Sequence, residues 1–205
     1  YDSFALPTKI KEEIVHLTDE FRPFIAPLPK VDAFLHEGKK LKIGKEAYEV
    51  IATPGHADGL VCFYQKERQV LLSTDHILPK ITPNIAYWFY GEENPLRSYE
   101  LSLEKIKKLD IAYAIPSHGE AFEKVHDRID EIWSHHEARL AECLSYMKEA
   151  ITVYQMCEKL FTQSLSVYDM QFAIGETMAH MEYLRQAGNC KRDLVDGQWY
   201  YRRVL

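Results

Sequence analysis

Short apolar runs separated by glycine and proline dominate the first part of the chain. Four runs have the length and the β-branched or aromatic content of buried strands, and they cover Tyr48–Ala52, Leu60–Tyr64, Gln69–Thr74 and Ile111–Ile115. A polar turn around Gly44 predicts that a hairpin leads into the first of these strands. The sequence therefore predicts strands that end in stiff polar loops, where reactive side chains are commonly held.

Helical spacing appears before and between these strands. Ile10, Ile14 and Leu17 recur every three or four residues, and Thr8 is a suitable N-cap, so a first helix is predicted over residues 8–24. Pro95 can begin a second helix that continues to about residue 109. A long amphipathic helix is predicted from residue 122 to about residue 150. Strands and helices together indicate an α/β fold.

The pattern changes after the long helix. Two further helices are predicted over Thr152–Phe161 and Asp169–Gln186. A hairpin follows over Cys190–Val204, with Asp196-Gly197 at its turn. Helix, helix and hairpin form the outline of a winged-helix module. We therefore predict two domains, residues 1–121 and residues 122–205.

Composition and charge exclude some classes of protein. A net charge of −6 argues against binding to nucleic acid by bulk charge. No apolar run reaches membrane-spanning length, and we expect a cytoplasmic protein that binds no membrane. The four cysteines form no Cys-x-x-Cys pair, so reduced and buried thiols are expected. The chain opens on Tyr1 rather than methionine, which we interpret as the sign of a fragment cut from a longer chain.

His56, Asp75 and His118 are the candidate functional side chains. Each directly follows a predicted strand, which is where α/β folds collect reactive groups. Imidazole nitrogens and a carboxylate oxygen are ligands that suit zinc or iron. Taken singly, a loop histidine can cap a turn and an aspartate after a strand can cap a helix. The three residues together favour a metal site.

Asp58 and His76 are candidates for a supporting role. Asp58 could orient His56 through a hydrogen bond, as metal-bound imidazoles commonly require, or it could be a helix N-cap. His76 directly follows Asp75 and is expected to support the loop. The aromatic run Tyr87–Tyr90 leaves two interpretations open, a substrate pocket or core packing.

The other histidines lie on predicted helices. The adjacent pair His135-His136 predicts a solvated helix face, because neighbouring residues on a helix point in different directions. His126 and His180 are expected at the surface or in an interface.

Three motifs resemble those of the metallo-β-lactamase superfamily and occur in the same order. They are Thr53-Pro54-Gly55-His56-Ala57-Asp58-Gly59, Ser73-Thr74-Asp75-His76-Ile77-Leu78-Pro79 and Pro116-Ser117-His118-Gly119. The stretch Asp75–Asn84 is similar to the glyoxalase-II-like branch, which carries a C-terminal winged-helix domain, and Glu176–Leu184 resembles that appended domain. The resemblance implies the C-terminal part of an αββα sandwich followed by a small winged-helix-like α+β module.

The resemblance also implies metal chemistry. His56 would bind the first metal ion, Asp75 would bridge both ions, and His118 would bind the second. The implied cofactors are two divalent metal ions, zinc first, with iron or manganese as alternatives. A metal-bound hydroxide would then attack a small-molecule ester or thioester, or a phosphodiester.

One signature of that superfamily, His-x-His-x-Asp-His, does not occur in this sequence. In the family it supplies two ligands to the first metal ion, another to the second, and an aspartate that orients the water. This chain is left with one ligand for the first ion and two for the second, whereas a catalytic zinc takes about three from the protein. We therefore expect the chain on its own to bind metal weakly and to be catalytically incompetent.

Three functions remain open at this point. The first is a hydrolase of small esters or thioesters, and the second is a ribonuclease or phosphodiesterase whose tail contacts nucleic acid. The third is a non-enzymatic module that binds a partner. From residue 151 onward the chain has six lysines and arginines against six aspartates and glutamates, so Lys191, Arg192, Arg202 and Arg203 alone are thin support for nucleic-acid binding.

A partial sandwich also predicts self-association. Without the other half of the family fold, apolar strand surface and a sheet edge would be uncovered. Such surfaces tend to pair, so we expect a homodimer.

Overall fold

The computed structural model describes residues 2–25 and 27–204. The chain forms two compact units, and their boundary falls inside helix α3 (Val125–Tyr146). Residues 33–138 form the large-sheet unit, and the segments before and after them form the small-sheet unit. This division differs from the predicted domains of residues 1–121 and 122–205, because α1 (Thr8–Phe21) packs against α5 (Val167–Gln186) and so belongs with the C-terminal segment.

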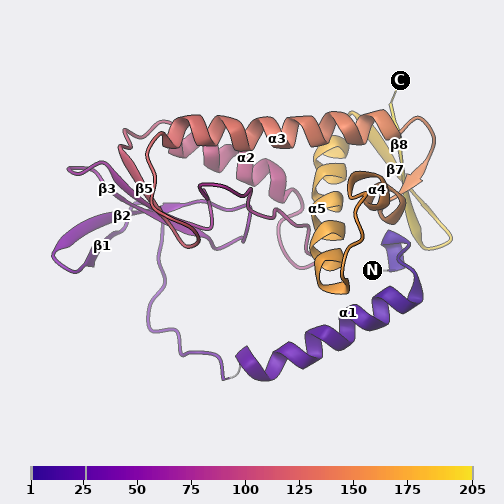
Figure 1. The fold of residues 1–205 in the computed structure, drawn as a ribbon, viewed down its shortest axis with the longest axis horizontal. Coiled ribbons are helices and arrows are strands. Elements are labelled where there is room, and N and C mark those ends of the chain that lie inside the picture. Colours follow the sequence, from indigo (N-terminus) through magenta and orange to yellow (C-terminus); the bar gives the residue numbers. More distant parts are fainter. Residues whose placement is uncertain (1, 26, 205) are drawn as a thin grey trace. The chain divides into compact units, whose positions relative to one another are not determined.

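The large-sheet unit contains a five-stranded sheet in the order β1-β2-β3-β4-β5. Strands β1, β2, β3 and β5 of this sheet are labelled in Figure 1. The strands span Lys40–Ile43, Glu46–Ala52, Val61–Gln65, Val70–Thr74 and Tyr113–Pro116. Neighbours are antiparallel except β4 and β5, which are parallel because a crossover containing helix α2 (Pro95–Ile106) joins them. The four predicted strands are confirmed, and β1 completes the hairpin predicted at Gly44, whose φ is +63°.

The large sheet is apolar on both faces. Cys62 and Leu71 point to one face and are fully buried. The register pairs Phe63 with Leu72 and Leu72 with Ile115, which places these three side chains together on the opposite face. That face is only partly covered, since Phe63 and Leu72 are half-buried and Ile115 is 42% exposed. A sheet that is apolar on both faces is typical of one buried between two layers.

Helix α2 begins where the sequence predicts. Asn94 is its N-cap, with the side-chain oxygen accepting from the Arg97 amide at 3.2 Å, and Pro95 occupies the first turn. Its buried residues include Tyr99 and Ile106. An ion pair between Lys107 and Asp130 joins the end of α2 to α3.

The small-sheet unit has the order helix, strand, helix, helix and hairpin after the end of α3. The strands β6 (Ile151–Thr152), β7 (Cys190–Val195) and β8 (Gln198–Arg203) form a sheet in the order β6-β8-β7. Helix α4 (Val153–Leu160) and helix α5 lie between β6 and β7 in the chain. Strand β6 was not predicted, because two residues are too few to show a period.

Local signals explain these elements. Thr152 and Gln155 form a capping box at the start of α4, each side chain bonding the other residue's backbone amide. Asp196 and Gly197 both have positive φ, +49° and +79°, as a two-residue hairpin turn of the predicted kind requires. The unit is completed by α1 and by two short 3₁₀ helices, Asp2–Phe4 and Arg22–Ile25.

A buried carboxylate, that of Glu182, accepts hydrogen bonds from several side chains of the small-sheet unit. Oε1 of Glu182 accepts hydrogen bonds from the Tyr201 hydroxyl at 2.6 Å and from Arg192 at 3.0 Å, and Oε2 accepts from Arg185 at 2.7 Å. The Arg192 guanidinium also lies 4.0 Å from the centre of the Trp199 ring. Glu182 is 1% exposed, so its charge is neutralised within this network rather than by water.

Two histidines are more buried than the sequence suggests. His135 is exposed as predicted, but His136 is fully buried, with its ring edge-on to Tyr99 at 5.7 Å, so the prediction of a solvated face was wrong for this residue. His180 is also buried, and its Nδ1 lies 2.8 Å from the Glu176 carbonyl oxygen.

All four cysteines are buried and unpaired, as predicted. Among the described residues, none of the helices is long and apolar enough to cross a membrane.

Candidate metal centre

The loop between β2 and β3 carries His56. The Thr53 amide donates to the Leu60 carbonyl at 2.8 Å and closes the loop. Nδ1 of His56 lies 2.8 Å from the Asn84 carbonyl oxygen, which can only accept, so Nδ1 carries the proton. The Nε2 lone pair is therefore available to a metal ion, which is the arrangement that metal-binding histidines commonly have.

Helix α2 fixes this loop at close range. Gly55 has a φ of +140°, and a Cβ added to it would lie 2.5 Å from Cβ of Tyr99. The Ser102 hydroxyl donates to the Pro54 carbonyl at 2.9 Å, and Lys105 Nζ donates to the Ala52 carbonyl at 2.8 Å. The glycine in this loop is thus required both by its backbone conformation and by the helix against it.

Asp75 follows a distorted strand end. The β4–β5 register shifts between Leu72 and Thr74, and Thr74 has a φ of +49°, which is unusual for a β-branched residue. The Thr74 hydroxyl donates to the Val61 carbonyl at 3.1 Å, and its carbonyl accepts from the Ser117 amide at 3.1 Å. These two bonds hold the residue in this conformation and determine the direction in which the chain leaves the strand.

The structure brings Asp75 and His118 together. Nε2 of His118 lies 3.4 Å from Oδ1 of Asp75, and the Ser117 hydroxyl donates to the same oxygen. The two loops also meet where Gly119, with a φ of +87°, leaves room for Pro79. Asp75 is partly shielded, with its side chain 32% exposed, whereas the His118 side chain is 71% exposed.

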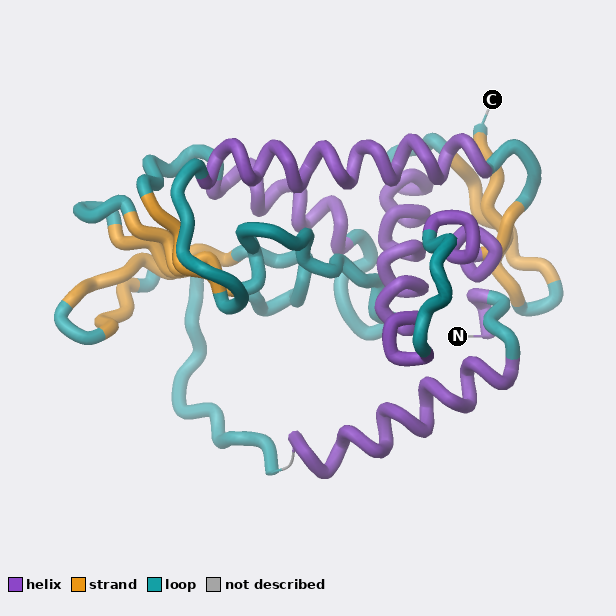
Figure 2. Tube along the Cα trace, in the orientation of Figure 1, coloured by secondary structure: helices purple, strands orange, loops and turns teal. Residues whose placement is uncertain are grey.

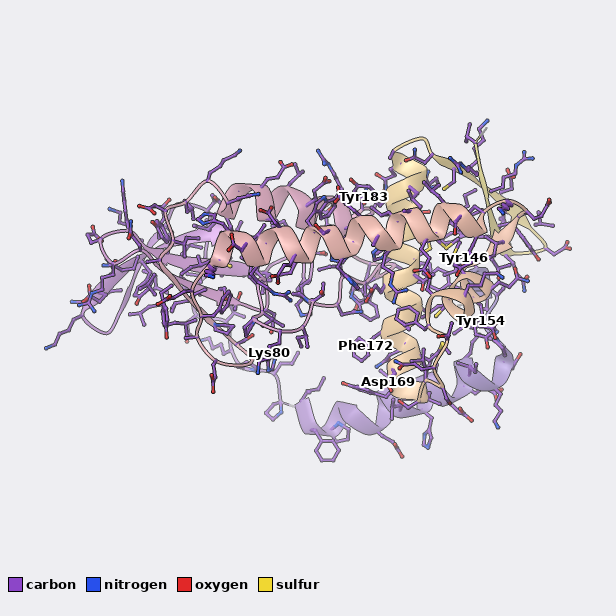
Figure 3. The ribbon with its side chains drawn as sticks, turned by 45° about the horizontal axis from the view of Figure 1, so that its top comes forward. Lys80, Tyr146, Tyr154, Asp169, Phe172 and Tyr183 are labelled. Atoms are coloured by element: carbon purple, nitrogen blue, oxygen red, sulfur yellow. The ribbon has the colours of Figure 1, made fainter. Side chains whose placement is uncertain are left out.

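An arginine on α3 holds the segment after Asp75, which contains neither helix nor strand up to α2 (Figure 2). Arg128 donates through Nε to the Leu78 carbonyl at 2.8 Å and through Nη2 to the Ile81 carbonyl at 3.0 Å. Between these two anchors, Lys80 is exposed (Figure 3). Main-chain contacts from a helix therefore fix a loop that has no regular structure of its own.

His76 lies beneath the Asp75 loop. Its carbonyl accepts from the Tyr99 hydroxyl at 2.8 Å, and the two rings meet edge-on at 5.1 Å. Complete burial lowers the pKa of His76 to about 3, although the Ser102 backbone opposes this fall, so the ring is neutral. Within the described part of the chain, neither ring nitrogen has a hydrogen bond of good geometry.

Asp58, which the sequence offered as a partner for His56, contacts the main chain around Glu92. Its Oδ1 accepts from the Glu92 amide at 3.4 Å, and a Cβ added to Gly91 would lie 2.7 Å from its Oδ2. The Asn84 carbonyl takes the position at His56 instead. The sequence could not show this partner, because every residue carries the same carbonyl oxygen.

The donor atoms are of the kinds that bind a divalent metal ion, but too few of the described ones lie close together to complete a site. Asp75 and His118 form a pair, and His56 offers a free Nε2. Across residues 2–25 and 27–204, no group of three or more His, Cys, Asp or Glu side chains lies close enough together to hold a metal ion. The chain therefore offers partial donor sets rather than a closed site.

Comparison with known proteins identifies the family. The model of the metallo-beta-lactamase superfamily matches residues 4–118, more than half of the chain. The chain belongs to the metallo-beta-lactamase superfamily. A second model, the metallo-beta-lactamase-like C-terminal domain, matches residues 140–204. The mixed α/β fold described above is the fold of this superfamily.

Solved structures of the superfamily share this fold. A beta-lactamase domain protein from Burkholderia ambifaria has a TM-score of 0.88 and 27% identity, covering 98% of this chain and 60% of that chain. A metallo-beta-lactamase family protein from Thermus thermophilus has a TM-score of 0.78 and 30% identity, covering 98% of this chain and 67% of that chain.

The curated proteins that this chain resembles are longer than the chain itself. A probable metallo-hydrolase of Bacillus subtilis is 26% identical over 148 residues, which is 69% of this chain and 46% of the relative. A beta-lactamase-like protein 2 homolog of Caenorhabditis elegans is 28% identical over 133 residues, which is 64% of this chain and 42% of the relative. The chain thus spans less than half the length of these relatives.

Proposed function

We propose that this chain supplies part of the two-metal centre of a hydrolase that acts on a small-molecule ester or thioester. The observation that carries the proposal is the Asp75–His118 pair at 3.4 Å together with a His56 ring whose Nε2 is free. His56 would hold the first ion, His118 the second, and Asp75 would be shared between them. Zinc is the first choice, with iron or manganese as alternatives.

The chain's own residues act by orienting these donors. The Asn84 carbonyl fixes the His56 tautomer, and Ser117 fixes one carboxylate oxygen of Asp75. The Tyr99 hydroxyl donates to the His76 carbonyl and Arg128 donates to the Leu78 carbonyl, and these two bonds hold the Asp75 loop. Bound metal ions would supply a water of lowered pKa and a Lewis acid for the substrate carbonyl.

We propose further that the chain alone is inactive. Three donors divided between two ions leave each ion short of the roughly three protein ligands of a catalytic zinc. The missing donors are those of the His-x-His-x-Asp-His string, which is absent from this sequence. Weak metal binding and negligible hydrolysis by the isolated chain follow from this shortage.

The small-sheet unit is proposed to be a winged-helix module of the glyoxalase-II-like kind. Its element order, with β6 joining the β7–β8 hairpin, supports this proposal. Equal numbers of basic and acidic residues after residue 150 favour a packing role over nucleic-acid contact. The cytoplasmic location expected from the sequence remains a proposal.

A homodimer is proposed through the uncovered face of the large sheet. Phe63, Leu72 and Ile115 lie on that face, and packing two such faces would remove them from water. Sedimentation at tens of micromolar tests this, and a monodisperse monomer would contradict it.

Metal retention tests the centre itself. After dialysis against zinc, we expect the chain to retain less than one zinc ion per chain by plasma mass spectrometry. Replacement of either Asp75 or His118 by alanine should remove most of what is retained. His16→Ala, at an exposed histidine of α1, is the matched control and should change nothing. Equal zinc retention by all of these variants would refute the site.

Hydrolysis is tested after the missing donors are supplied. The part of the Burkholderia ambifaria relative that this chain does not cover can be co-expressed with it. A zinc-loaded complex that hydrolyses an acyl thioester supports the proposal. A complex that cleaves RNA and leaves thioesters intact would favour the nuclease instead.

A further inference from the structure

The segment between Asn84 and Glu92 is anchored at both ends on the loop that carries His56. At one end the Asn84 carbonyl accepts from the His56 ring. At the other end the Glu92 amide donates to Asp58, and Gly91 lies against the same carboxylate. Residues 87–90, Tyr-Trp-Phe-Tyr, lie between these anchors, and we call them the aromatic arm.

The aromatic arm has a buried base and an exposed end. Ile85 and Ala86, directly before it, are 0% and 3% exposed. Phe89 is 53% exposed and Tyr90 is 89% exposed. The Gly91 amide donates to the Trp88 carbonyl at 3.1 Å, so a turn holds the exposed end. The exposed end of the run therefore does not pack in the core.

We propose that the aromatic arm binds an uncharged apolar group of the substrate, an acyl chain or aryl ring, beside His56. The inference rests on the proposed hydrolase function and adds the substrate class. Covering a large aromatic side chain with an apolar group removes much apolar surface from water, and this burial favours binding. The two anchors fix the position of the arm relative to the loop of the candidate metal ligand. A substrate group held by the arm would therefore have a defined position relative to the reaction centre.

Charge around the arm favours an uncharged ligand over a nucleic acid. Asp58, Glu92 and Glu93 are exposed and lie at the C-terminal anchor of the arm. Single-stranded nucleic acids also stack on exposed aromatic rings, but their binding sites pair those rings with basic grooves. Acidic side chains at this position would repel a phosphate backbone.

Binding can be measured without any hydrolysis. Hexananilide is an uncharged amide that carries both an acyl chain and an aryl ring, and it is added to the ¹⁵N-labelled chain in the presence of EDTA. Amide resonances of residues 85–93 should shift on titration. The double variant Phe89→Ser/Tyr90→Ser should weaken binding about tenfold, the factor expected for the loss of about 1.4 kcal/mol of contact. Tyr113→Ser, at a 39% exposed tyrosine of β5, is the matched control and should bind within about twofold of the parent chain.

Several results would overturn the inference. Unchanged affinity in the double variant, an equal loss in the Tyr113 control, or no shift at residues 85–93 would each do so. Tighter binding of an octathymidylate than of hexananilide would assign the arm to nucleic acid instead. Because EDTA removes metal ions, failure here is distinguishable from failure of the metal centre, which the zinc retention experiment tests separately.

Discussion

Gly55→Ala is the substitution whose cost the structure defines best. Two separate penalties apply at this position. A φ of +140° is a conformation that L residues rarely adopt, at a cost of about 1–3 kcal/mol. The new Cβ would also lie 2.5 Å from the Tyr99 Cβ and 2.7 Å from its Cα, and overpacking of this kind costs about 1–3 kcal/mol. The sum predicts a loss of about 2–6 kcal/mol in the free energy of unfolding.

Two other glycines of the same unit separate the penalties. Gly44 has a φ of +63° with nothing within 4 Å of an added Cβ, so Gly44→Ala carries the backbone cost alone, about 1–2 kcal/mol. Gly59 has neither a left-handed φ nor a near neighbour. Gly59→Ala should therefore be neutral or stabilising by up to about 1 kcal/mol.

Urea unfolding followed by tryptophan fluorescence measures all three variants. A Trp199→Phe background leaves Trp88 and Trp133 as reporters, and both belong to the large-sheet unit. Gly55→Ala should lower the midpoint most, because only it forces the His56 loop away from α2. If Gly55→Ala and Gly44→Ala lose the same free energy, the close approach to Tyr99 contributes nothing and the reasoning fails.

Three further predictions concern the small-sheet unit and the thiols. Tyr201→Phe removes a 2.6 Å donor from the buried Glu182 and should cost about 1.5–3 kcal/mol in urea unfolding, whereas Tyr200→Phe, which loses a half-buried 3.4 Å contact, should cost under about 1 kcal/mol. Thr152→Ala breaks the capping box of α4 and should cost about 0.5–2 kcal/mol by the same assay, with a smaller loss contradicting the cap. Burial raises the pKa of every cysteine thiol, to about 12 for Cys143 and about 11 for the other three, so the thiolate fraction stays near 1% or less up to pH 9. Ellman's reagent should therefore find no fast-reacting thiol in the native chain between pH 7 and 9, and a rapid phase would refute this.

The sequence predicted the elements whose signals are local. Continuous apolar runs predicted β2, β3 and β4 within one or two residues, because each strand carries apolar side chains on both faces. The hairpin turn at Asp196 and Gly197 was predictable from its residue types. Strand β6 was missed because it exists only by pairing with β8, which is distant in the sequence.

The sequence pointed to the candidate site residues but could not show the contacts that position them. The meeting of Asp75 with His118 follows from their positions at the ends of adjacent parallel strands. The φ of Thr74 and the hydroxyl bond from Ser117 depend on a shift of register that no local pattern shows. Burial of His136 depends on the ring of Tyr99 from another helix, so a helical wheel could not reveal it.

The bond from His56 to the Asn84 main chain has an evolutionary consequence. Any amino acid at position 84 presents the same carbonyl oxygen, provided that the backbone path is kept. Substitutions at position 84 would therefore leave the imidazole oriented, and no covariation between positions 56 and 84 is expected. Insertions or deletions between them, by contrast, would move the acceptor, so lineages should preserve the spacing more strictly than the identity.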